Sequence, residues 1–380
     1  MRIVIAPDSF KDALSAQQAA KAIGTGARAA CADAELVECP LGDGGEGTLD
    51  AVLAASGAVE RRASVHDPLG RPIEARWGLI ERGGERSAIV ELAEASGLQR
   101  LPPAERDARV TSTYGLGELI IAALDESVEH LVLTLGGSAT NDGGSGMLAA
   151  LGARFLDAHG EPLPPGGAAL AKLARIELDG LDPRLARVRF EAAVDVDNPL
   201  CGERGASAVF GPQKGADPAT VAELDAALLK LAEVAADTIG EDHRELPGAG
   251  AAGGMGFAAR AFLQAQLRPG IELVIEQLGF EALLEGADLL FVGEGGLDAQ
   301  SLGGKTPIGA ARVAKRLGIP CVALVGKLGP GWQGAHQQGV TAAFALADGP
   351  MSLEQALPRT FEALAARTEE VVRLWQAALG

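Results

Sequence analysis

The chain has 380 residues, of which 47% are hydrophobic and 22% charged, so it has the length and composition of two globular domains rather than one. Its formal net charge of −18 disfavours nucleic acid and anionic membrane surfaces as partners, although an anionic small molecule can still bind at a locally positive site. Four cysteines without a C-x-x-C pair, no signal peptide and no apolar run of membrane-spanning length indicate reduced thiols in a cytoplasmic protein.

The N-terminal region predicts alternating strands and helices. Ser15 followed by Gln18 is the residue pair of a capping box, which predicts that a helix begins at Ala16. The expected elements are a strand at Met1–Ala6, a helix at Ala16–Ala30, a strand at Glu35–Cys39 and a helix at Thr48–Ser56. This alternation indicates a parallel sheet covered by helices.

The pattern changes in the middle of the chain. Residues 59–92 contain short alternating segments separated by turn signals, such as Asp67-Pro68-Leu69-Gly70, which predict antiparallel strands and a new domain. The elements expected after them are a helix at Gly117–Asp125, a strand at His130–Leu135, a helix at Gly146–Gly152, a strand at Arg187–Val194, and helices at Pro218–Ile239 and Gly254–Gln266.

From Ala287 the strand–helix alternation returns. The expected elements are strands at Asp288–Val292, Cys321–Val325 and Thr341–Leu346, a helix at Pro307–Leu317 and a helical region at Leu353–Ala378. The simplest architecture is α/β with two domains. Residues 1–59 plus 287–380 form a discontinuous, flavodoxin- or Rossmann-like parallel-sheet domain, and residues 60–286 form an inserted mixed α/β domain. The cleft between the domains is the expected active site.

Two polar segments follow the first two predicted strands. Ser9 and Lys11 can bind an anionic group, or Asp8 and Ser9 can merely cap a turn beside a solvated lysine. In the segment from Asp43 to Thr48, three glycines, Gly44, Gly45 and Gly47, allow backbone N–H groups to converge on a phosphate. Asp43 and Glu46 are candidate Mg²⁺ ligands, and the alternative is a capped turn.

Two further segments carry candidate chemistry in the middle of the chain. The connection Gly136–Gly146 is rich in glycine, hydroxyl and amide groups, a composition that favours a phosphate-binding loop over a plain turn. Asp195 and Asp197 follow a predicted strand and share one side of it, so they can bind Mg²⁺ or remove a hydroxyl proton. An Asx-turn before Pro199 is the alternative.

The fifth segment, Gly293–Thr306, lies between a predicted strand and helix. Its Gly304-Lys305-Thr306 end is similar to a P-loop, but position 299 is alanine where that motif requires glycine. The lysine at a helix N-terminus still suits phosphate. A different stretch, Gly248–Gly253, matches G-x-G-x-x-G without a strand before it, so we interpret it as a flexible glycine loop and not as a dinucleotide site.

Six of these segments, in this order, resemble the bacterial glycerate kinase family over essentially the whole chain. They are APDSFKDALSA, DGGEGT, GGSATNDGGSGM, DVDNPL with FGPQKGA, PGAGAAGGMG, and GEG-x-x-D-x-QS-x-x-GK-x-P. The resemblance implies ATP-dependent phosphorylation of D-glycerate to 2-phosphoglycerate with Mg²⁺. It also implies that one domain is flavodoxin-like and the other restriction-endonuclease-like. One position departs from the family pattern, because Gly296 stands where GEGR has arginine.

On this basis we assign roles to the candidate residues. The expected catalytic residues are Asp197, Lys11 and Asp195. The expected substrate-binding residues are Asp8, Ser9, Lys11, Asn198, Gln213, Lys214, Asp298, Gln300 and Ser301. The expected ATP- and phosphate-binding residues are Gly44, Gly45, Gly47, Gly136, Gly137, Ser138, Thr140, Asn141, Gly295 and Lys305. The expected metal ligands are Asp43, Glu46, Asp195 and Glu294.

Two other functions compete with this one. An NAD-dependent hydroxy-acid dehydrogenase shares the substrate size and the doubly wound domain, and a glycerate-binding sensor that has lost turnover is suggested by Gly296. The residues alone leave open which hydroxyl is phosphorylated and which oligomer forms.

Overall fold

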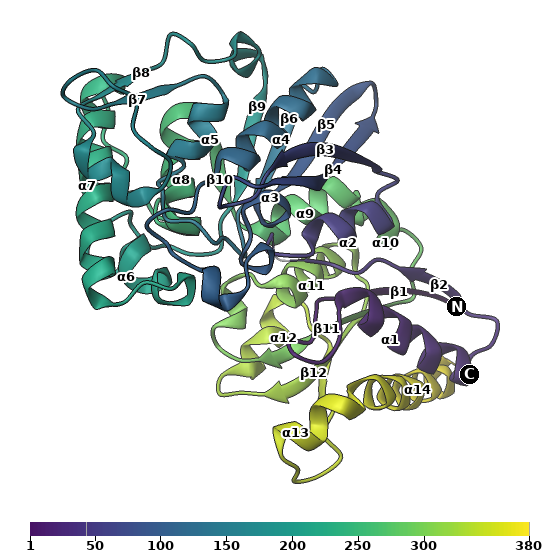
Figure 1. Cartoon of the computed structure of the whole chain (residues 1–380). Coiled ribbons are helices and arrows are strands. Elements are labelled where there is room, and N and C mark those ends of the chain that lie inside the picture. The colour runs from purple at the N-terminus through teal and green to yellow at the C-terminus, as the bar shows by residue number, and fades with distance from the viewer. Residues whose placement is uncertain (43, 380) are drawn as a thin grey trace. The chain divides into compact units, whose positions relative to one another are not determined.

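The computed structural model describes residues 1–42 and 44–379 of the chain. Contacts divide the chain into two compact units (Figure 1). Unit 1 comprises the described residues of Met1–Asp43, Asp50–Gly57 and Ile271–Gly380, and unit 2 those of Gly44–Leu49 and Ala58–Gly270. The sequence placed residues 271–286 in the inserted domain, whereas their contacts group them with unit 1.

A parallel sheet forms the centre of unit 1. It consists of β1 (Arg2–Pro7), β2 (Glu35–Glu38), β11 (Leu289–Leu297), β12 (Cys321–Leu328) and β13 (Ala342–Ala345). The strand order is β13-β12-β11-β1-β2, and every described pair is parallel. Strands buried on both faces require continuous apolar runs, and β1 and β11 provide them.

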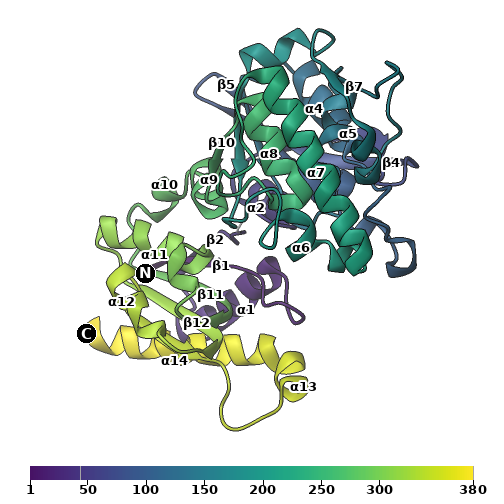
Figure 2. The same ribbon diagram turned by 90° about the vertical axis from the view of Figure 1, so that its left-hand side faces the viewer.

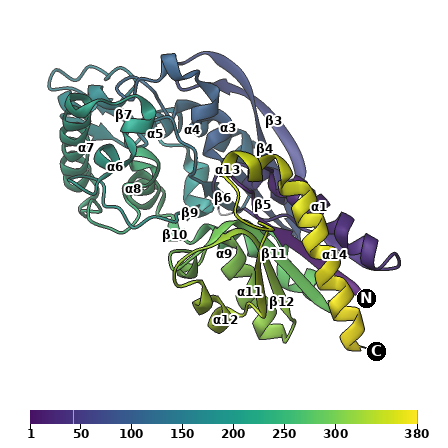
Figure 3. The same ribbon diagram turned by 90° about the horizontal axis from the view of Figure 1, so that it is seen from below.

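Helices cover this sheet. Those lying wholly or mainly in unit 1 are α1 (Ala16–Ala30), α2 (Thr48–Ala55), α9 (Gly270–Leu278), α10 (Phe280–Leu284), α11 (Thr306–Leu317), α12 (Ala335–Gln338), α13 (Leu353–Ala356) and α14 (Thr360–Leu379). Figure 3 shows α1 alongside α14. A Cβ added to Gly26 would lie 2.0 Å from the carbonyl oxygen of Ala365, so only glycine permits this close approach of the two helices.

Unit 2 is built on a mixed sheet of six strands. They are β3 (Val59–His66), β4 (Pro72–Arg82), β5 (Glu85–Glu91), β6 (His130–Thr134), β9 (Arg189–Ala193) and β10 (Gln266–Arg268), in the order β10-β9-β6-β5-β4-β3. The pairs β3–β4 and β4–β5 are antiparallel, as the turn signals predicted, and the pairs from β5 to β10 are parallel. The carboxyl ends of β5, β6 and β9 therefore meet at one edge of the sheet.

The remaining elements of unit 2 pack around this sheet. They are the hairpin strands β7 (Arg154–Leu156) and β8 (Arg175–Glu177), and the helices α3 (Leu92–Ser96), α4 (Tyr114–Asp125), α5 (Ser145–Ala150), α6 (Ala206–Phe210), α7 (Pro218–Ile239) and α8 (Ala251–Leu263). Figure 2 shows α7 and α8 side by side. Each unit has its own apolar core, with Trp77 in that of unit 2 and Phe291 in that of unit 1.

Local signals predicted several boundaries correctly. The capping box of Ser15 and Gln18 is present at the start of α1, and α7 has the predicted bounds. The prediction of a flexible loop at Gly248–Gly253 was wrong. This segment is largely buried, and the carbonyl oxygen of Gly253 accepts a 2.9 Å hydrogen bond from the Gly143 N–H. Its glycines are required by close packing, since a Cβ at Gly253 would lie 2.1 Å from the Thr140 carbonyl oxygen.

Among the described residues, none of the helices combines the length and the apolar character that crossing a membrane would need. All four cysteines are unpaired.

Candidate functional site

In unit 1, two of the predicted segments come together at the carboxyl ends of β1 and β11. Pro7 pairs with Gly293 in the parallel register, and the Asp8 N–H donates a 2.8 Å hydrogen bond to the Gly293 carbonyl. The Asp8 carboxylate accepts a 2.6 Å hydrogen bond from the Thr306 hydroxyl at the start of α11. The carboxyl ends of parallel strands are where open α/β sheets bind ligands. Unit 1 therefore gathers Asp8 and the segment Gly293–Thr306 at such an edge.

Glu294 is a buried acid at this edge. It is 8% exposed, and its Oε1 atom lacks a hydrogen-bond partner among the described residues. Burial raises the pKa of Glu294 to about 7, against the opposing attraction of Lys305. A buried carboxylate with an unsatisfied oxygen is costly in free energy, and such groups concentrate at functional sites.

The loop after Glu294 is folded by its own polar groups. The Asp298 carboxylate accepts hydrogen bonds from the backbone N–H groups of Gln300 and Ser301. The Ser301 hydroxyl, which is buried, donates to the Gly296 carbonyl at 3.3 Å. Asp298 and Ser301 thus shape the loop, whereas Gln300 and Lys305 are exposed and Lys305 occupies the N-cap position of α11.

Lys327 is a residue that the sequence analysis missed. It pairs with Gly296 across β11 and β12, and a Cβ added to Gly296 would lie 3.1 Å from Lys327 Cε. The stem of this lysine therefore covers the glycine, where a longer side chain would have to displace it. Nothing in the local sequence predicts this contact, because it depends on the register of two strands joined by a helix.

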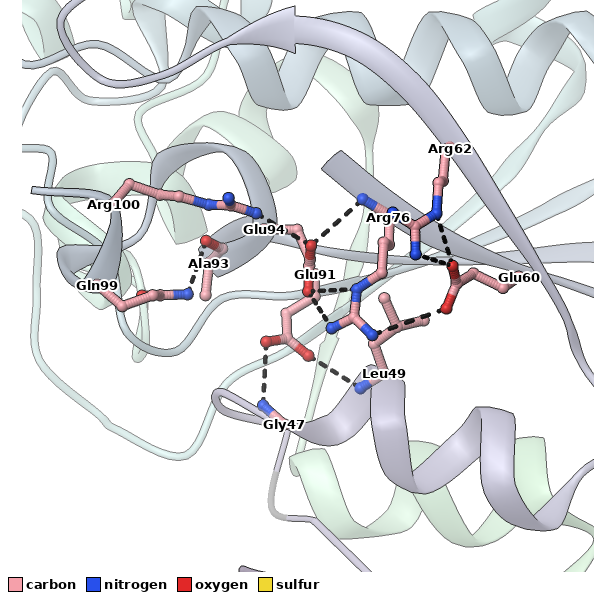
Figure 4. A network of polar contacts seen from close by, with 10 residues as sticks. All are labelled: Gly47, Leu49, Glu60, Arg62, Arg76, Glu91, Ala93, Glu94, Gln99 and Arg100. Atoms are coloured by element: carbon pink, nitrogen blue, oxygen red, sulfur yellow. Dashed lines mark hydrogen bonds and ion pairs between the residues drawn. The ribbon is translucent and has the colours of Figure 1, made fainter. Parts of the chain in front are cut away.

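In unit 2, Glu91 at the carboxyl end of β5 holds the glycine loop that begins at Gly44. Its two carboxylate oxygens accept hydrogen bonds from the N–H groups of Gly47, at 3.0 Å, and Leu49, at 2.9 Å (Figure 4). Next to it, Glu94 forms ion pairs with Arg76 and Arg100, at 2.6 and 3.1 Å. Glu91 is a charged residue at the end of an apolar strand, and this local signal could have identified it from the sequence.

The glycine loops of the second and third predicted segments contact each other. A Cβ added to Gly136 would lie 2.4 Å from the Cα of Gly45, and Gly137 has a φ of +72° beside the Glu46 side chain. Glu46 itself is exposed. Asp43, the other predicted ligand of this loop, lies outside the described residues. The structure thus places Gly44–Gly47 and Gly136–Gly137 against each other at the edge formed by β5, β6 and β9.

The rest of the Gly136–Gly146 connection points its polar side chains inward. The Asn141 amide donates a 2.9 Å hydrogen bond to the Ser207 hydroxyl. The fully buried Asp142 carboxylate accepts from the Thr113 hydroxyl and from the backbone N–H groups of Thr113, Gly144 and Gly146. Burial raises the pKa of Asp142 despite these donors. Thr140 and Asn141 each keep one buried oxygen without a hydrogen-bond partner among the described residues.

Lys214 is buried against this connection and holds it by hydrogen bonds. It is 1% exposed, and its amine donates to the Ser138 hydroxyl at 2.9 Å and to the Thr140 carbonyl at 2.6 Å. Burial lowers the pKa of Lys214 to about 7, while Asp142 opposes this shift. Its contacts in the structure hold the loop, and its predicted contact with substrate stays a prediction. The neighbouring Gln213 is exposed.

The acids after β9 lie in different surroundings. The Asp195 carboxylate accepts a 2.9 Å hydrogen bond from the Gly270 N–H. The Asp197 side chain is 76% exposed and pairs with Arg204 at 3.0 Å. The Asn198 amide donates to the Arg204 carbonyl at 2.7 Å, so Asp197 and Asn198 both contact Arg204.

Unit 1 contains an acid that suits one coordination position of Mg²⁺. Among the described residues, His, Cys, Asp and Glu form no group of three or more that could hold a metal ion. Mg²⁺, however, commonly takes only one or two carboxylates and completes its shell with phosphates and water. The free oxygen of Glu294 is a ligand of that kind.

Known proteins match this chain over nearly its whole length. Residues 3–376 match the model of the glycerate kinase family. The chain is 47% identical over 375 residues to a glycerate kinase of Halalkalibacterium halodurans, covering 98% of each chain. It is 45% identical over 362 residues to a glycerate 2-kinase of Escherichia coli strain K12, covering 95% of this chain and 94% of the relative.

A solved structure gives the same result for the fold. The crystal structure of a candidate glycerate kinase 2 from Salmonella typhimurium LT2 covers 100% of this chain and 99% of its own, with a TM-score of 0.86 and 46% identity. The likeness extends through both units and through every segment on which the predicted site rests. The chain therefore belongs to the glycerate kinase family.

Proposed function

We propose that this chain transfers the γ-phosphoryl group of ATP to D-glycerate in the cytoplasm, giving 2-phosphoglycerate. The observation that carries the proposal is the edge of unit 1, where Glu294 keeps a buried, unsatisfied carboxylate oxygen close to Lys305 at the start of α11. Phosphoryl transfer needs such an arrangement of cation-binding acid and positive charge. Transfer to the 2-hydroxyl is supported by the name of the Escherichia coli relative.

The same proposal includes a finer description of the fold. Numbered within unit 1 alone, the strand order is 2-1-3-4-5, which is the order of flavodoxin-like domains. We assign unit 1 to that class. For unit 2 we propose a restriction-endonuclease-like fold, which rests on the resemblance of the sequence segments and is compatible with its mixed sheet.

In unit 1, Glu294 and Asp8 would hold Mg²⁺ with the donor phosphates. When bound, the ion would neutralise charge on those phosphates. Lys305 presents its amine at the N-terminus of α11, where the helix dipole also favours an anion. Lys11 and Ser9 are exposed and can hold a carboxylate or a phosphate. These groups would align the donor and offset the charge of the transferred group.

In unit 2, the glycine loop at Gly136–Gly137 would bind phosphate through its backbone N–H groups. The N–H groups of Gly44 and Gly47 in the neighbouring loop already donate to Thr48 and Glu91, so that loop would instead support Gly136–Gly137. Asp197 would orient or deprotonate the glycerate hydroxyl, assisted by Asp195. Asp197 is accessible to an incoming substrate, because its side chain is 76% exposed. Lys214 would act indirectly, by fixing the loop that carries Ser138 and Thr140.

The test is ADP release from ATP and Mg²⁺ by purified protein, with and without D-glycerate. We expect release that depends on glycerate, and a product whose phosphorus spectrum matches 2-phosphoglycerate rather than the 3-isomer. Glycerate binding without ADP release would instead support the sensor hypothesis. No strand leads directly into Gly248, as a dinucleotide-binding motif requires, and the segment is packed inside unit 2. Both observations count against the dehydrogenase hypothesis. An NADH titration without binding would complete its exclusion.

A further inference from the structure

Unit 1 contains a mostly apolar pocket whose lining lies largely outside the predicted motifs. It has a volume of about 350 Å³ and lies beyond the carboxyl ends of β11, β12 and β13, with α13 and α14 on its other side. Figure 2 shows the segment that leads from the sheet to α13 and α14. Its apolar wall consists of Leu346, Met351, Leu353, Leu357, Ala363 and Ala366.

The size and chemistry of this wall exclude glycerate as its main occupant. The volume is within the range of about 300–1,000 Å³ that is typical of sites for cofactors and other large small molecules. A three-carbon hydroxy acid is much smaller and presents polar groups on every side. Leu353 of this wall is 72% exposed, so the apolar face of a ligand can cover it. The planar base of a nucleoside has two such faces.

Polar groups lie at one side of the same pocket. Lys11, Lys327 and Gly295 all belong to its lining, and Gly295 directly follows Glu294 in the chain. A Cβ added to Gly295 would meet nothing closer than the backbone nitrogen of Lys11 at 3.9 Å, so the Gly295 backbone is open to a ligand. Phosphates attached to a nucleoside in the pocket would therefore have two lysines and the backbone next to Glu294 within the same lining.

Four further side chains, two of them acidic, give the pocket hydrogen-bonding capacity. Its lining also includes Asp348, Arg359, Thr360 and Glu362. A carboxylate can accept from ribose hydroxyls. The Thr360 hydroxyl donates to the Leu357 carbonyl at 2.9 Å and can still accept from a base edge. A mostly apolar cavity with a few polar groups is the usual form of a site for a small molecule.

We propose that this pocket binds the nucleoside of the phosphate donor, with its base against Leu357 and Ala363 and its phosphates toward Lys11 and Lys327. The inference rests on the proposed function in that it requires a nucleotide donor. It assigns Lys327 and the α13–α14 region to donor binding, whereas the sequence motifs assigned only phosphate contacts.

The experiment fills the pocket with a large side chain and measures the binding of ADP and of tripolyphosphate separately. Ala363→Trp places a large ring in the cavity, and Ala377→Trp places the same ring at an exposed position of α14 outside it. By titration calorimetry, A363W should raise the Kd of ADP with Mg²⁺ by at least about tenfold. Its Kd for inorganic tripolyphosphate, which has no base, should stay within about twofold, as should both values for A377W.

The outcomes separate this inference from the proposed function. If wild-type protein binds no ADP, the proposed donor is wrong. If wild type binds ADP and A363W binds it equally well, the donor stands and the pocket is not its nucleoside site. Hydrogen exchange on wild-type protein provides a second test that does not depend on how A363W folds. Amides in residues 346–366 should exchange more slowly when ADP is added, and unchanged exchange there would refute the inference.

Discussion

Glu294 is a carboxylate whose environment opposes its charge. Its pKa is about 7 in the folded protein and has a reference value of 4.5, so between these values the native state binds more protons than the unfolded state. Stability from this group is therefore present at low pH and lost as pH rises through that window, by at most about 1.4 kcal/mol per pH unit. The protein keeps a charge here that its own fold disfavours, which is the pattern of a functional residue.

Glu294→Gln should stabilise the protein and inactivate it. At pH 8 the amide removes a buried charge, so we expect the free energy of unfolding to rise by about 1–3 kcal/mol, while glycerate-dependent ADP release falls at least about 100-fold. Urea denaturation at pH 5 and pH 8, with ADP-release kinetics, measures both effects. Glu370→Gln, at an exposed position of α14, is the matched control. Loss of stability together with activity would mean that Glu294 is structural.

Lys214 has the opposite dependence on pH. The pKa of Lys214 is about 7 in the folded protein, compared with a reference value of 10.5. Between these two values the unfolded state binds more protons than the folded state, so the free energy of unfolding rises with pH. Between pH 7 and 8.5, wild type should gain up to about 1.4 kcal/mol per pH unit from this group. Lys214→Met should lose that slope, whereas Lys172→Met, at an exposed site, should keep it. Denaturation curves at the two pH values measure this pH dependence. An equal change of unfolding free energy with pH in all three proteins would contradict the prediction.

At the scale of elements, the glycine loop of unit 2 is held by a residue far away in sequence. Both oxygens of Glu91 bind backbone N–H groups at the start of α2 (Figure 4). Glycines favour the positive φ angles of this loop, such as +88° at Gly47, but they also make the unfolded chain more flexible. The loop thus owes its fixed shape to tertiary hydrogen bonds rather than to its own sequence.

Glu91→Ala should free this loop. Removing both acceptors leaves the Gly47 and Leu49 N–H groups unsatisfied, which should cost about 2–4 kcal/mol and lower activity. Hydrogen exchange of the Leu49 amide should accelerate, since each 1.4 kcal/mol corresponds to about tenfold. Glu60→Ala is the control, because Glu60 pairs with Arg62 and Arg76 nearer the surface and should cost no more than about 1 kcal/mol. Unchanged exchange in the Glu91 variant would show that other contacts hold the loop.

At the scale of the whole molecule, the two units have separate cores and separate tryptophans. Trp77 is 2% exposed in the core of unit 2, while Trp332 and Trp375 belong to unit 1. Trp77→Phe therefore reports on unit 1 by fluorescence, and the double variant Trp332→Phe/Trp375→Phe reports on unit 2. A ligand that binds only one unit should raise the free energy of unfolding of that unit more than that of the other.

ADP with Mg²⁺ should raise the urea midpoint reported by the Trp77→Phe protein more than the midpoint reported by the double variant. At about 100 times its Kd, the ligand contributes about 2.7 kcal/mol to the unit that binds it. Coincident transitions that shift together would show instead that the two units unfold as one. Urea midpoints measured without ligand give the loss of stability that each substitution itself causes.

The sequence by itself determined the local structure and the membership of the family. The capping box of α1, the bounds of α7 and the antiparallel strands after residue 58 follow from short-range signals, since they depend on neighbours within a few residues. The six segments of the site could be recognised for the same reason, because each is contiguous. Their glycines and acids indicated phosphate chemistry without indicating which neighbours they would meet.

The tertiary structure alone decided which of these groups are free to act and which hold the others in place. Lys214 looked like a substrate contact beside Gln213, but packing buries it under Ser138, 76 residues away. Glu91 reaches Gly47 across 44 residues, and Lys327 covers Gly296 only because β11 and β12 pair in one register. Contacts of this kind arise from the burial of apolar strands and helices, which fixes the polar side chains they carry. The pocket beside α14 exists for the same reason, since its lining comes from distant parts of the chain that the packing of unit 1 brings together.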